Sequence, residues 1–370
     1  MITPPATLGI LGGGQLGRYF VMAARTMGYK TMVLEPDPHA PAGAVADEHL
    51  VAAFSDEAAL QQLAARCAAV TTEFENPPAT AMDWLSNHTA VRPSPSAVAI
   101  AQDRRLEKAF LREAGIATGP LAVIETDSDI GSAFEIHFPA ILKTARMGYD
   151  GKGQIPVASH EALAAAWAEL DSQPCVLEER LALDGEISVV LARGSFGEMA
   201  VYPVAHNTHI DGILDCTIVP FAAPGAADLA CAIADALDYV GVLAVEMFVV
   251  DGQLLVNEIA PRPHNSGHWT LDAARTSQFE QQVRAVCGVG LGDPSLVAPG
   301  VAMVNLLGDL WVGGEPDWSV ALAHPNASLH LYGKQTARPG RKMGHLTVTA
   351  ATPEEARRLA TAIRSDLTAR

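Results

Sequence analysis

Several features that define other protein classes are missing from this 370-residue sequence. No stretch approaches the roughly 18 consecutive apolar residues of a membrane-spanning helix, and no basic leader precedes the short apolar run at residues 6–11. The five cysteines are widely spaced and include no C-x-x-C pair, which predicts buried, reduced thiols. These absences favour a cytoplasmic globular enzyme over a secreted, membrane or fibrous protein.

Basic residues are also scarce. Lys and Arg number 25 against 42 Asp and Glu, which gives a net charge of −17. A field of this sign repels nucleic acid and anionic membranes, so neither is expected as a partner. An anionic ligand therefore depends on metal ions, helix N-termini or a compact basic cluster.

The pattern of apolar residues predicts an α/β protein of four units. The first unit alternates strands and helices and is predicted to be doubly wound. We set the boundaries at residues 1–96, 97–186, 187–298 and 299–370. Within them we predict helices at 15–27, 57–66, 97–114, 161–170, 228–240 and 353–367, and strands at 30–34, 68–72, 140–143, 175–179, 187–192, 199–203, 243–250 and 253–259. After Pro299 we predict short strands that precede the last helix.

A glycine-rich turn follows the first strand. Its sequence, Gly12-Gly13-Gly14-Gln15-Leu16-Gly17, matches G-x-G-x-x-G, and Glu35 ends the next strand where a ribose-binding acid would lie. The pattern is typical of dinucleotide binding. A tight strand-to-helix turn, or a site for a substrate phosphate at the helix N-terminus, would give the same residues.

A lysine and a second glycine-rich segment form the first candidate for phosphate chemistry. Lys143 ends an apolar strand, and Gly148, Tyr149, Asp150, Gly151, Lys152, Gly153 and Gln154 follow. A strand-borne ammonium beside a glycine-rich flap suits the oxygens of a triphosphate, although the sequence is not the Walker A motif. A surface hairpin is the alternative.

Carboxylates in apolar strands form the second candidate. Glu246 lies within an apolar run, and an Asp251-Gly252 turn places either Asn257 or Glu258 opposite it, depending on loop length. Oxygen ligands of this kind suit Mg²⁺, whereas a buried ion pair is the alternative. Glu178-Glu179-Arg180-Leu181 could receive adenine through backbone groups, and Glu186 could bind ribose hydroxyls.

Other polar clusters remain open to two interpretations. Lys334, Arg338, Arg341 and Lys342 form the densest basic cluster, which suits a phosphate monoester or a solvated turn. Glu73 and Glu75 follow a strand of the first unit, where substrate binding and a rigid turn are both plausible. Histidines at 206, 209, 264 and 268 have spacings that could suggest zinc, but no H-E-x-x-H motif is present.

Four features follow one another along the chain: Lys143, the glycine-rich segment 148–154, Glu178-Glu179, and Glu246 with Asn257-Glu258. With these features in this order, the chain resembles the ATP-grasp superfamily over nearly its whole length. Four segments, 12–18, 206–209, 263–269 and 338–345, resemble the 5-(carboxyamino)imidazole ribonucleotide synthase family of purine biosynthesis. The resemblance implies an N-terminal Rossmann-like substrate domain, a small and a large ATP-grasp lobe, and a C-terminal domain that completes the large lobe. It also implies a homodimer.

The activity implied by this resemblance is ATP- and bicarbonate-dependent carboxylation of 5-aminoimidazole ribonucleotide, without biotin or NAD. Nucleotide-binding positions fall on Arg104, Lys143, Gly148, Tyr149, Asp150, Gly151, Lys152, Gly153, Gln154, Glu178, Glu179, Arg180, Leu181, Glu186, His209, Asn257 and Glu258. Magnesium positions fall on Glu246 and Glu258. Substrate positions fall on Gln15, Leu16, Glu73, Tyr149, His264, Asn265, Ser266, Lys334 and Arg341.

The chemistry expected of such a site is the activation of bicarbonate as carboxyphosphate. Lys143, Arg262 and Mg²⁺ would spread the charge of the transferring phosphoryl group, and Asp150 could orient the amine or take its proton. Asp150 could equally be a turn residue. Competing hypotheses are another ATP-grasp ligase, such as formate-dependent glycinamide ribonucleotide formyltransferase, a dehydrogenase, and a nucleotide sensor without turnover.

Overall fold

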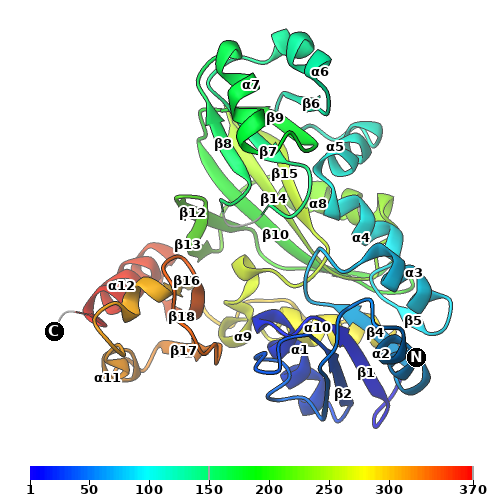
Figure 1. Ribbon diagram of the computed structural model, residues 1–370. Helices are drawn as coiled ribbons and strands as arrows, with labels where there is room; N and C mark the ends of the chain where they lie inside the picture. The colour runs from blue at the N-terminus through cyan, green and yellow to red at the C-terminus, as the bar shows by residue number, and fades with distance from the viewer. Residues whose placement is uncertain (149–150, 369–370) are drawn as a thin grey trace.

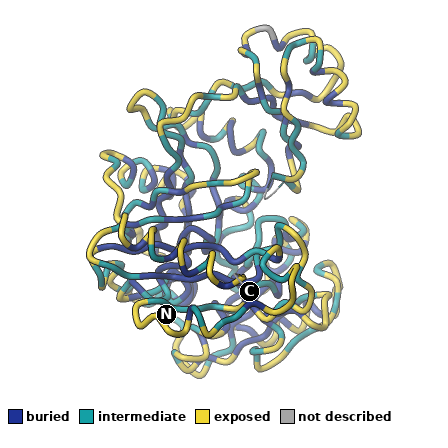
Figure 2. The backbone as a smooth tube through the Cα atoms, turned by 90° about the vertical axis from the view of Figure 1, so that its left-hand side faces the viewer, coloured by how far each residue is buried: buried dark blue, intermediate teal, exposed yellow. Residues whose placement is uncertain are grey.

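Three β-sheets organise the chain in the computed structural model, which describes residues 1–148 and 151–368 (Figure 1). Buried residues run through the sheets, while exposed residues gather on loops and outer helices (Figure 2). Within the described residues, no helix combines the length and apolar character needed to cross a bilayer. Each of the five cysteines is free; four are buried as predicted and Cys231 is only partly buried.

The first sheet is parallel, with the order β3-β2-β1-β4-β5, which confirms the doubly wound prediction. Its strands read as apolar runs because helices cover both faces. The strands are β1 (Thr7–Leu11), β2 (Lys30–Leu34), β3 (Glu48–Leu50), β4 (Ala69–Thr72) and β5 (Ala90–Val91). The helices that follow them are α1 (Gln15–Thr26), α2 (Glu57–Arg66), α3 (Ala79–Ser86), α4 (Pro95–Gln102) and α5 (Arg104–Glu113).

The single helix predicted over residues 97–114 is wrong, because the chain breaks at Asp103 between α4 and α5. Asp103 has an extended backbone, and its carboxylate caps α5 by accepting from the Arg105 backbone N–H at 3.1 Å. The same carboxylate forms ion pairs with the side chains of Arg105 and Arg146. Aspartate is a good N-cap and a poor interior residue, so the break follows from local chemistry.

The second sheet forms a small antiparallel lobe with the order β6-β9-β7-β8, shown at the top of Figure 1. Its elements are β6 (Leu121–Ile124), α6 (Asp127–Ser132), η1 (Ala133–Glu135), β7 (Ala140–Thr144), β8 (Gln154–Val157), α7 (His160–Glu169) and β9 (Cys175–Glu179). Leu163 and Trp167 of α7 pack against Leu142 and Leu177 of the sheet. The glycine-rich segment lies between β7 and β8 and ends at Gln154, the first residue of β8.

The third sheet has nine strands, and its main path is β15-β14-β10-β12-β13-β16-β18-β17. The strands are β10 (Gly185–Arg193), β11 (Met199–Val201), β12 (Ala205–Ile210), β13 (Ile213–Val219), β14 (Gly241–Val250), β15 (Gln253–Ala260), β16 (Gly300–Leu307), β17 (Ala327–Leu331) and β18 (Lys342–Ala350). Two of them, β12 and β13, were not predicted. The C-terminal strands continue the same sheet, and β16 and β18 are long, whereas short strands were expected.

Helices of the second half connect the layers. They are α8 (Ala226–Ala236), η2 (Asn265–Gly267), α9 (Thr270–Ala273), α10 (Gln278–Cys287), η3 (Gly308–Trp311), α11 (Trp318–Leu322) and α12 (Pro353–Asp366). Val283 and Val286 of α10 share an apolar cluster with Leu8 and Phe20 of the first sheet's layer. Helix α10 therefore holds the parallel sheet against the large sheet, although it lies far along the chain from the strands of the parallel sheet.

Candidate nucleotide and metal site

Two glutamates face each other where β14 and β15 pair. The turn at Asp251-Gly252 is a two-residue loop, since Val250 pairs with Gln253, and continued pairing would set Glu246 opposite Asn257. A bulge instead pairs Glu246 with Glu258. The two glutamates therefore occupy opposite positions on paired strands, close enough for the charge of Glu258 to act on Glu246, and the amide Oδ1 of Asn257 is buried without a hydrogen-bond partner.

The electrostatics of this pair favour a bound cation. Burial, and then the charge of Glu258, raise the pKa of Glu246 to about 7. Burial would also raise the pKa of Glu258, but the Arg104 guanidinium at 3.2 Å, together with Lys143 and Arg262, lowers that pKa. Two carboxylates and an orphaned amide oxygen are hard donors of the kind Mg²⁺ prefers. The residues present fit magnesium.

A buried row of opposite charges joins the small lobe to this pair. The Glu178 carboxylate of β9 accepts from the Lys143 ammonium of β7, and its other oxygen lies 3.4 Å from the Lys108 ammonium of α5. Burial alone would raise the pKa of Glu178, but Lys143 and Lys108 lower it to about 2. Lys108 also donates to the carbonyl of Asn257 in the bulge.

Lys108 and Glu107 also belong to the site, although neither was predicted from the sequence. Both are fully buried, and Glu107 accepts from the Ile259 N–H at 2.6 Å, beside the bulge. Burial raises the pKa of Glu107 to about 7, although Lys108 opposes this. The available signal was the spacing of Arg104, Lys108 and Leu111, which puts two cations and an apolar residue on one helical face.

The glycine-rich segment reaches the large sheet. Gly151 and Gly153 have positive φ, and a Cβ on Gly153 would lie 2.6 Å from Thr144 Oγ1. A Cβ on Gly151 would lie 2.9 Å from the Asp211 carbonyl, in the turn between β12 and β13. Tyr149 and Asp150 lie outside the described residues, so their predicted roles stay predictions.

The remaining residues of the nucleotide set divide into two groups. Glu179 points away from Glu178, toward His137 at 3.2 Å, and the Arg180 N–H donates to the Pro139 carbonyl, just before Leu181. On the large sheet, Glu186 Oε2 lies 2.8 Å from His209 Nδ1. Burial opposes protonation of His209, but Glu186 and Glu246 raise its pKa.

The N-terminal glycine turn is filled by the protein's own carboxylates. Gly14 and Gly17 donate their backbone N–H groups to Glu73, and Gly13 donates to Glu35 at 2.9 Å. A dinucleotide pyrophosphate would need these same donors. The arrangement therefore favours the tight-turn interpretation. Gln15 begins α1, and Leu16 is buried against Phe279 and Tyr332.

Arg262 lies between the first domain and the carboxylate pair. Its guanidinium forms an ion pair with Glu75 and donates to the Pro263 carbonyl at 2.9 Å. The field of Arg262 also lowers the pKa of Glu258, after the larger effects of Arg104 and Lys143. These three predicted cations therefore act on one carboxylate.

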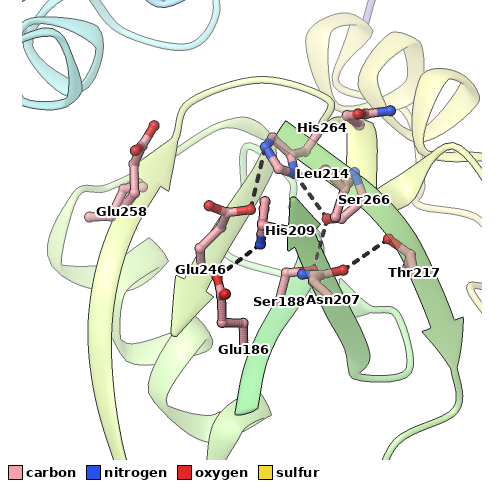
Figure 3. Close-up of polar contacts among 12 residues, drawn as sticks. Glu186, Ser188, Asn207, His209, Leu214, Thr217, Glu246, Glu258, His264 and Ser266 are labelled. Carbon is pink, nitrogen blue, oxygen red and sulfur yellow. Dashed lines mark hydrogen bonds and ion pairs between the residues drawn. The ribbon is translucent and has the colours of Figure 1, made fainter. Parts of the chain in front are cut away.

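His264, Asn265 and Ser266 follow β15 and turn back over the sheet (Figure 3). His264 Nε2 lies 3.7 Å from Glu246 Oε1, and burial and Arg262 lower the pKa of His264 well below its usual value. Asn265 forms a buried, reciprocal amide pair with Asn305. The side chain of Ser266 is fully buried and bonded within the protein.

The basic segment lies between β17 and β18. Lys334 donates to the Lys342 carbonyl at 2.7 Å, and Arg341 donates to the Thr336 carbonyl at 2.8 Å. Lys342, which we did not assign a role, contributes a field that lowers the pKa of Glu246, a smaller effect than burial and Glu258. The predicted phosphate role of Lys334 and Arg341 stays a prediction.

Asp272, His330 and His345 bring three possible metal-ligand atoms within 4.8 Å of one another. The ring planes of His330 and His345 differ by only 12°, with centroids 4.5 Å apart. Stacked imidazoles direct their in-plane lone pairs side by side, so these two rings cannot converge on one ion as arranged. His330 instead donates to Asp272 at 2.9 Å.

Comparison with known proteins defines the class. Three family models match consecutive parts of the chain: a ribonucleotide synthetase preATP-grasp domain at residues 5–102, an ATP-grasp domain at 109–279, and a phosphoribosylaminoimidazole carboxylase C-terminal domain at 301–359. Together with the three sheets and the opposed carboxylates, these matches identify an ATP-grasp enzyme.

Relatives define the family. N5-carboxyaminoimidazole ribonucleotide synthase of Bacillus subtilis is 44% identical over 94% of this chain and 92% of its own. An ADP complex of an N5-carboxyaminoimidazole ribonucleotide synthetase superposes with a TM-score of 0.92 at 38% identity, covering 98% of this chain and 97% of that one. The Aspergillus clavatus enzyme in complex with ADP and 5-aminoimidazole ribonucleotide gives 0.87 at 30% identity, covering 98% of each. The chain belongs to the N5-carboxyaminoimidazole ribonucleotide synthase family.

Proposed function

We propose that this chain carboxylates the amine of 5-aminoimidazole ribonucleotide with bicarbonate and ATP, releasing ADP and phosphate. The observation that carries the proposal is the Glu246–Glu258 pair at the bulge, beside the cations Arg104 and Lys143. Such a site suits phosphoryl transfer, in which catalysis consists mainly of positioning and charge stabilisation. We assign the substrates from the names of the related enzymes and from the ligands of the related structures.

The first step makes bicarbonate reactive. One bicarbonate oxygen attacks the γ-phosphorus of ATP, the bond from that phosphorus to the β,γ-bridging oxygen breaks, and ADP leaves. Mg²⁺ held by Glu246 and Glu258 would neutralise charge on the phosphate oxygens. Lys143 and Arg262 spread the rest, and both are already held in place by carboxylates, Glu178 and Glu75. The product is carboxyphosphate.

The second step transfers the carboxyl group. The substrate amine attacks the carboxyl carbon, the carbon–oxygen bond to phosphate breaks, and the amine loses a proton. Asp150 is our candidate for orienting the amine or taking that proton. Lys334 and Arg341 are proposed to bind the substrate phosphate, and the segments at Gln15, Glu73 and His264 to contact the rest of the nucleotide. No biotin is needed, because the mixed anhydride itself delivers the carboxyl group.

We also propose that the enzyme is a cytoplasmic homodimer. The free cysteines support a reducing compartment, and the family resemblance supports the dimer. Light scattering after gel filtration measures the oligomeric state. A single species near the 38.9 kDa of one chain would contradict the dimer.

One assay separates the proposed activity from its rivals. ADP release is measured with ATP and Mg²⁺ while aminoimidazole ribonucleotide, bicarbonate, glycinamide ribonucleotide or formate is supplied in turn. The proposal predicts release that requires the imidazole nucleotide and bicarbonate. Release driven by glycinamide ribonucleotide and formate would favour the formyltransferase, and binding of ATP without release would favour a sensor.

A further inference from the structure

A chain of buried hydrogen bonds runs through the large sheet and ends on His264 (Figure 3). Thr217 of β13 donates to Asn207 Oδ1 of β12 at 2.9 Å, and Asn207 Nδ2 donates to Ser188 Oγ of β10 at 2.9 Å. Ser188 then donates to Ser266 Oγ at 2.8 Å. The four side chains are buried, so each must find its partner inside the protein.

The direction of this chain assigns the proton on His264. Because Ser266 Oγ accepts from Ser188, its own proton is directed to His264 Nδ1 at 2.9 Å. The backbone N–H of Ser266 also lies 3.3 Å from the same nitrogen and can only donate. Two donors therefore face Nδ1, which must be an unprotonated acceptor. A neutral imidazole with an acceptor at Nδ1 carries its proton at Nε2.

That Nε2 proton faces Glu246. The distance from His264 Nε2 to Glu246 Oε1 is 3.7 Å, which is longer than a hydrogen bond. Glu246 Oε1 thus has the His264 N–H as a neighbour without being engaged by it in a hydrogen bond. A fixed N–H at this distance attracts one oxygen of the carboxylate and so biases its orientation for the metal, as outer-shell partners do in metal sites.

We propose that His264 is a positioning residue that orients the Glu246 carboxylate for magnesium, through an Nε2–H fixed by Ser266. Ser188, Asn207 and Thr217 hold Ser266 in the donating role. The inference rests on the proposed function only in placing magnesium at Glu246. It gives a functional role to the chain of buried hydrogen bonds that crosses three strands of the large sheet.

The first test reads the tautomer directly in the full-length wild-type protein. Nitrogen-15 NMR of histidine-labelled enzyme without magnesium distinguishes the two imidazole nitrogens, and the spectrum of His264→Gln identifies the signal. We expect a neutral ring protonated at Nε2. A ring protonated at Nδ1, or at both nitrogens, overturns the proposal. This readout requires no turnover and no assumption about the carboxylated substrate.

The second test compares two variants that differ in one donor. His264→Gln keeps an N–H near the position of Nε2, whereas His264→Leu removes it. Mg²⁺ affinity is measured by calorimetry on the enzyme–ADP complex. We expect His264→Leu to weaken Mg²⁺ binding roughly 10- to 100-fold, with His264→Gln recovering most of the loss. Wild-type affinity in the Leu variant, or equal weakening in both, overturns the proposal.

The same variants separate this role from substrate binding and from failure of the proposed function. If His264 only contacts the imidazole nucleotide, His264→Leu raises the KM for that nucleotide and leaves Mg²⁺ affinity unchanged, which overturns the proposal. If the enzyme carboxylates a different amine, the Mg²⁺ and NMR results keep their predicted pattern while the substrate assay fails.

Discussion

Replacing Lys108 by Met tests whether α5 anchors the bulge. The substitution keeps the aliphatic stem and removes the ammonium that contacts Glu178 and the Asn257 carbonyl. The carbonyl then loses a donor inside the protein, while Glu178 retains Lys143. The substitution therefore removes one buried hydrogen bond from a charged donor and one of the two ammonium groups that contact Glu178.

The structure sets the magnitude expected for Lys108→Met. A hydrogen bond to a charged group contributes about 1.5–3 kcal/mol. An uncompensated buried charge would cost about 3–5 kcal/mol, but Lys143 keeps Glu178 paired. We therefore expect the free energy of unfolding to fall by about 2–3 kcal/mol. Because the bulge presents Asn257 and Glu258, kcat/KM for ATP should fall roughly 10- to 100-fold.

Urea unfolding and steady-state ADP release measure the two effects. Arg112→Met provides a matched control, since Arg112 lies on the exposed side of the same helix. The control should change the free energy of unfolding by less than about 0.5 kcal/mol. If Lys108→Met behaves like the control in both assays, α5 does not anchor the bulge and the reasoning fails.

Three further predictions address separate contacts. Glu258→Gln should reduce Mg-ATP turnover roughly 100-fold. It should change the free energy of unfolding by less than about 1 kcal/mol, because the lost repulsion with Glu246 offsets the lost ion pair with Arg104. Equal losses of activity and stability would favour a structural ion pair. Asp103 has a pKa lowered to about 2 by Arg105 and Arg146 against the effect of burial. The extra stability of wild type over Asp103→Asn should therefore be complete above about pH 4 and disappear as pH falls through about 2; a pH-independent difference in denaturant unfolding would contradict this. Gly153→Ala should cost about 1–3 kcal/mol in thermal unfolding, since φ is positive there and the new methyl would meet Thr144, and an unchanged midpoint would refute the strain.

Periodicity predicted the elements whose stability is local. The helices at Gln15–Thr26 and Glu57–Arg66 and the buried strands of the first sheet were found because apolar residues recur at the period of the element. The break at Asp103 was missed because only one residue interrupts an otherwise helical pattern. Strand β12 was missed because His206, Asn207 and His209 make it polar, and its burial depends on partners in other strands.

The site was predicted by residue type more completely than by geometry. Glu246 and Glu258 were identified as a pair, but the sequence did not decide whether Asn257 or Glu258 lies opposite Glu246. The bulge that decides this depends on a contact between Lys108 and Asn257, which are far apart in the sequence. The carboxylates that fill the N-terminal glycine turn were likewise invisible in a motif that specifies only the turn.

Isotope transfer from bicarbonate tests the central claim most directly. The enzyme is given ATP, Mg²⁺, 5-aminoimidazole ribonucleotide and bicarbonate labelled with ¹³C and ¹⁸O. If bicarbonate is activated by phosphoryl transfer, one ¹⁸O appears in the released phosphate and the ¹³C appears in a carboxyl group bonded to the substrate amine. Phosphate that carries no ¹⁸O, released while ADP accumulates, would show that water and not bicarbonate accepts the phosphoryl group, which contradicts the account.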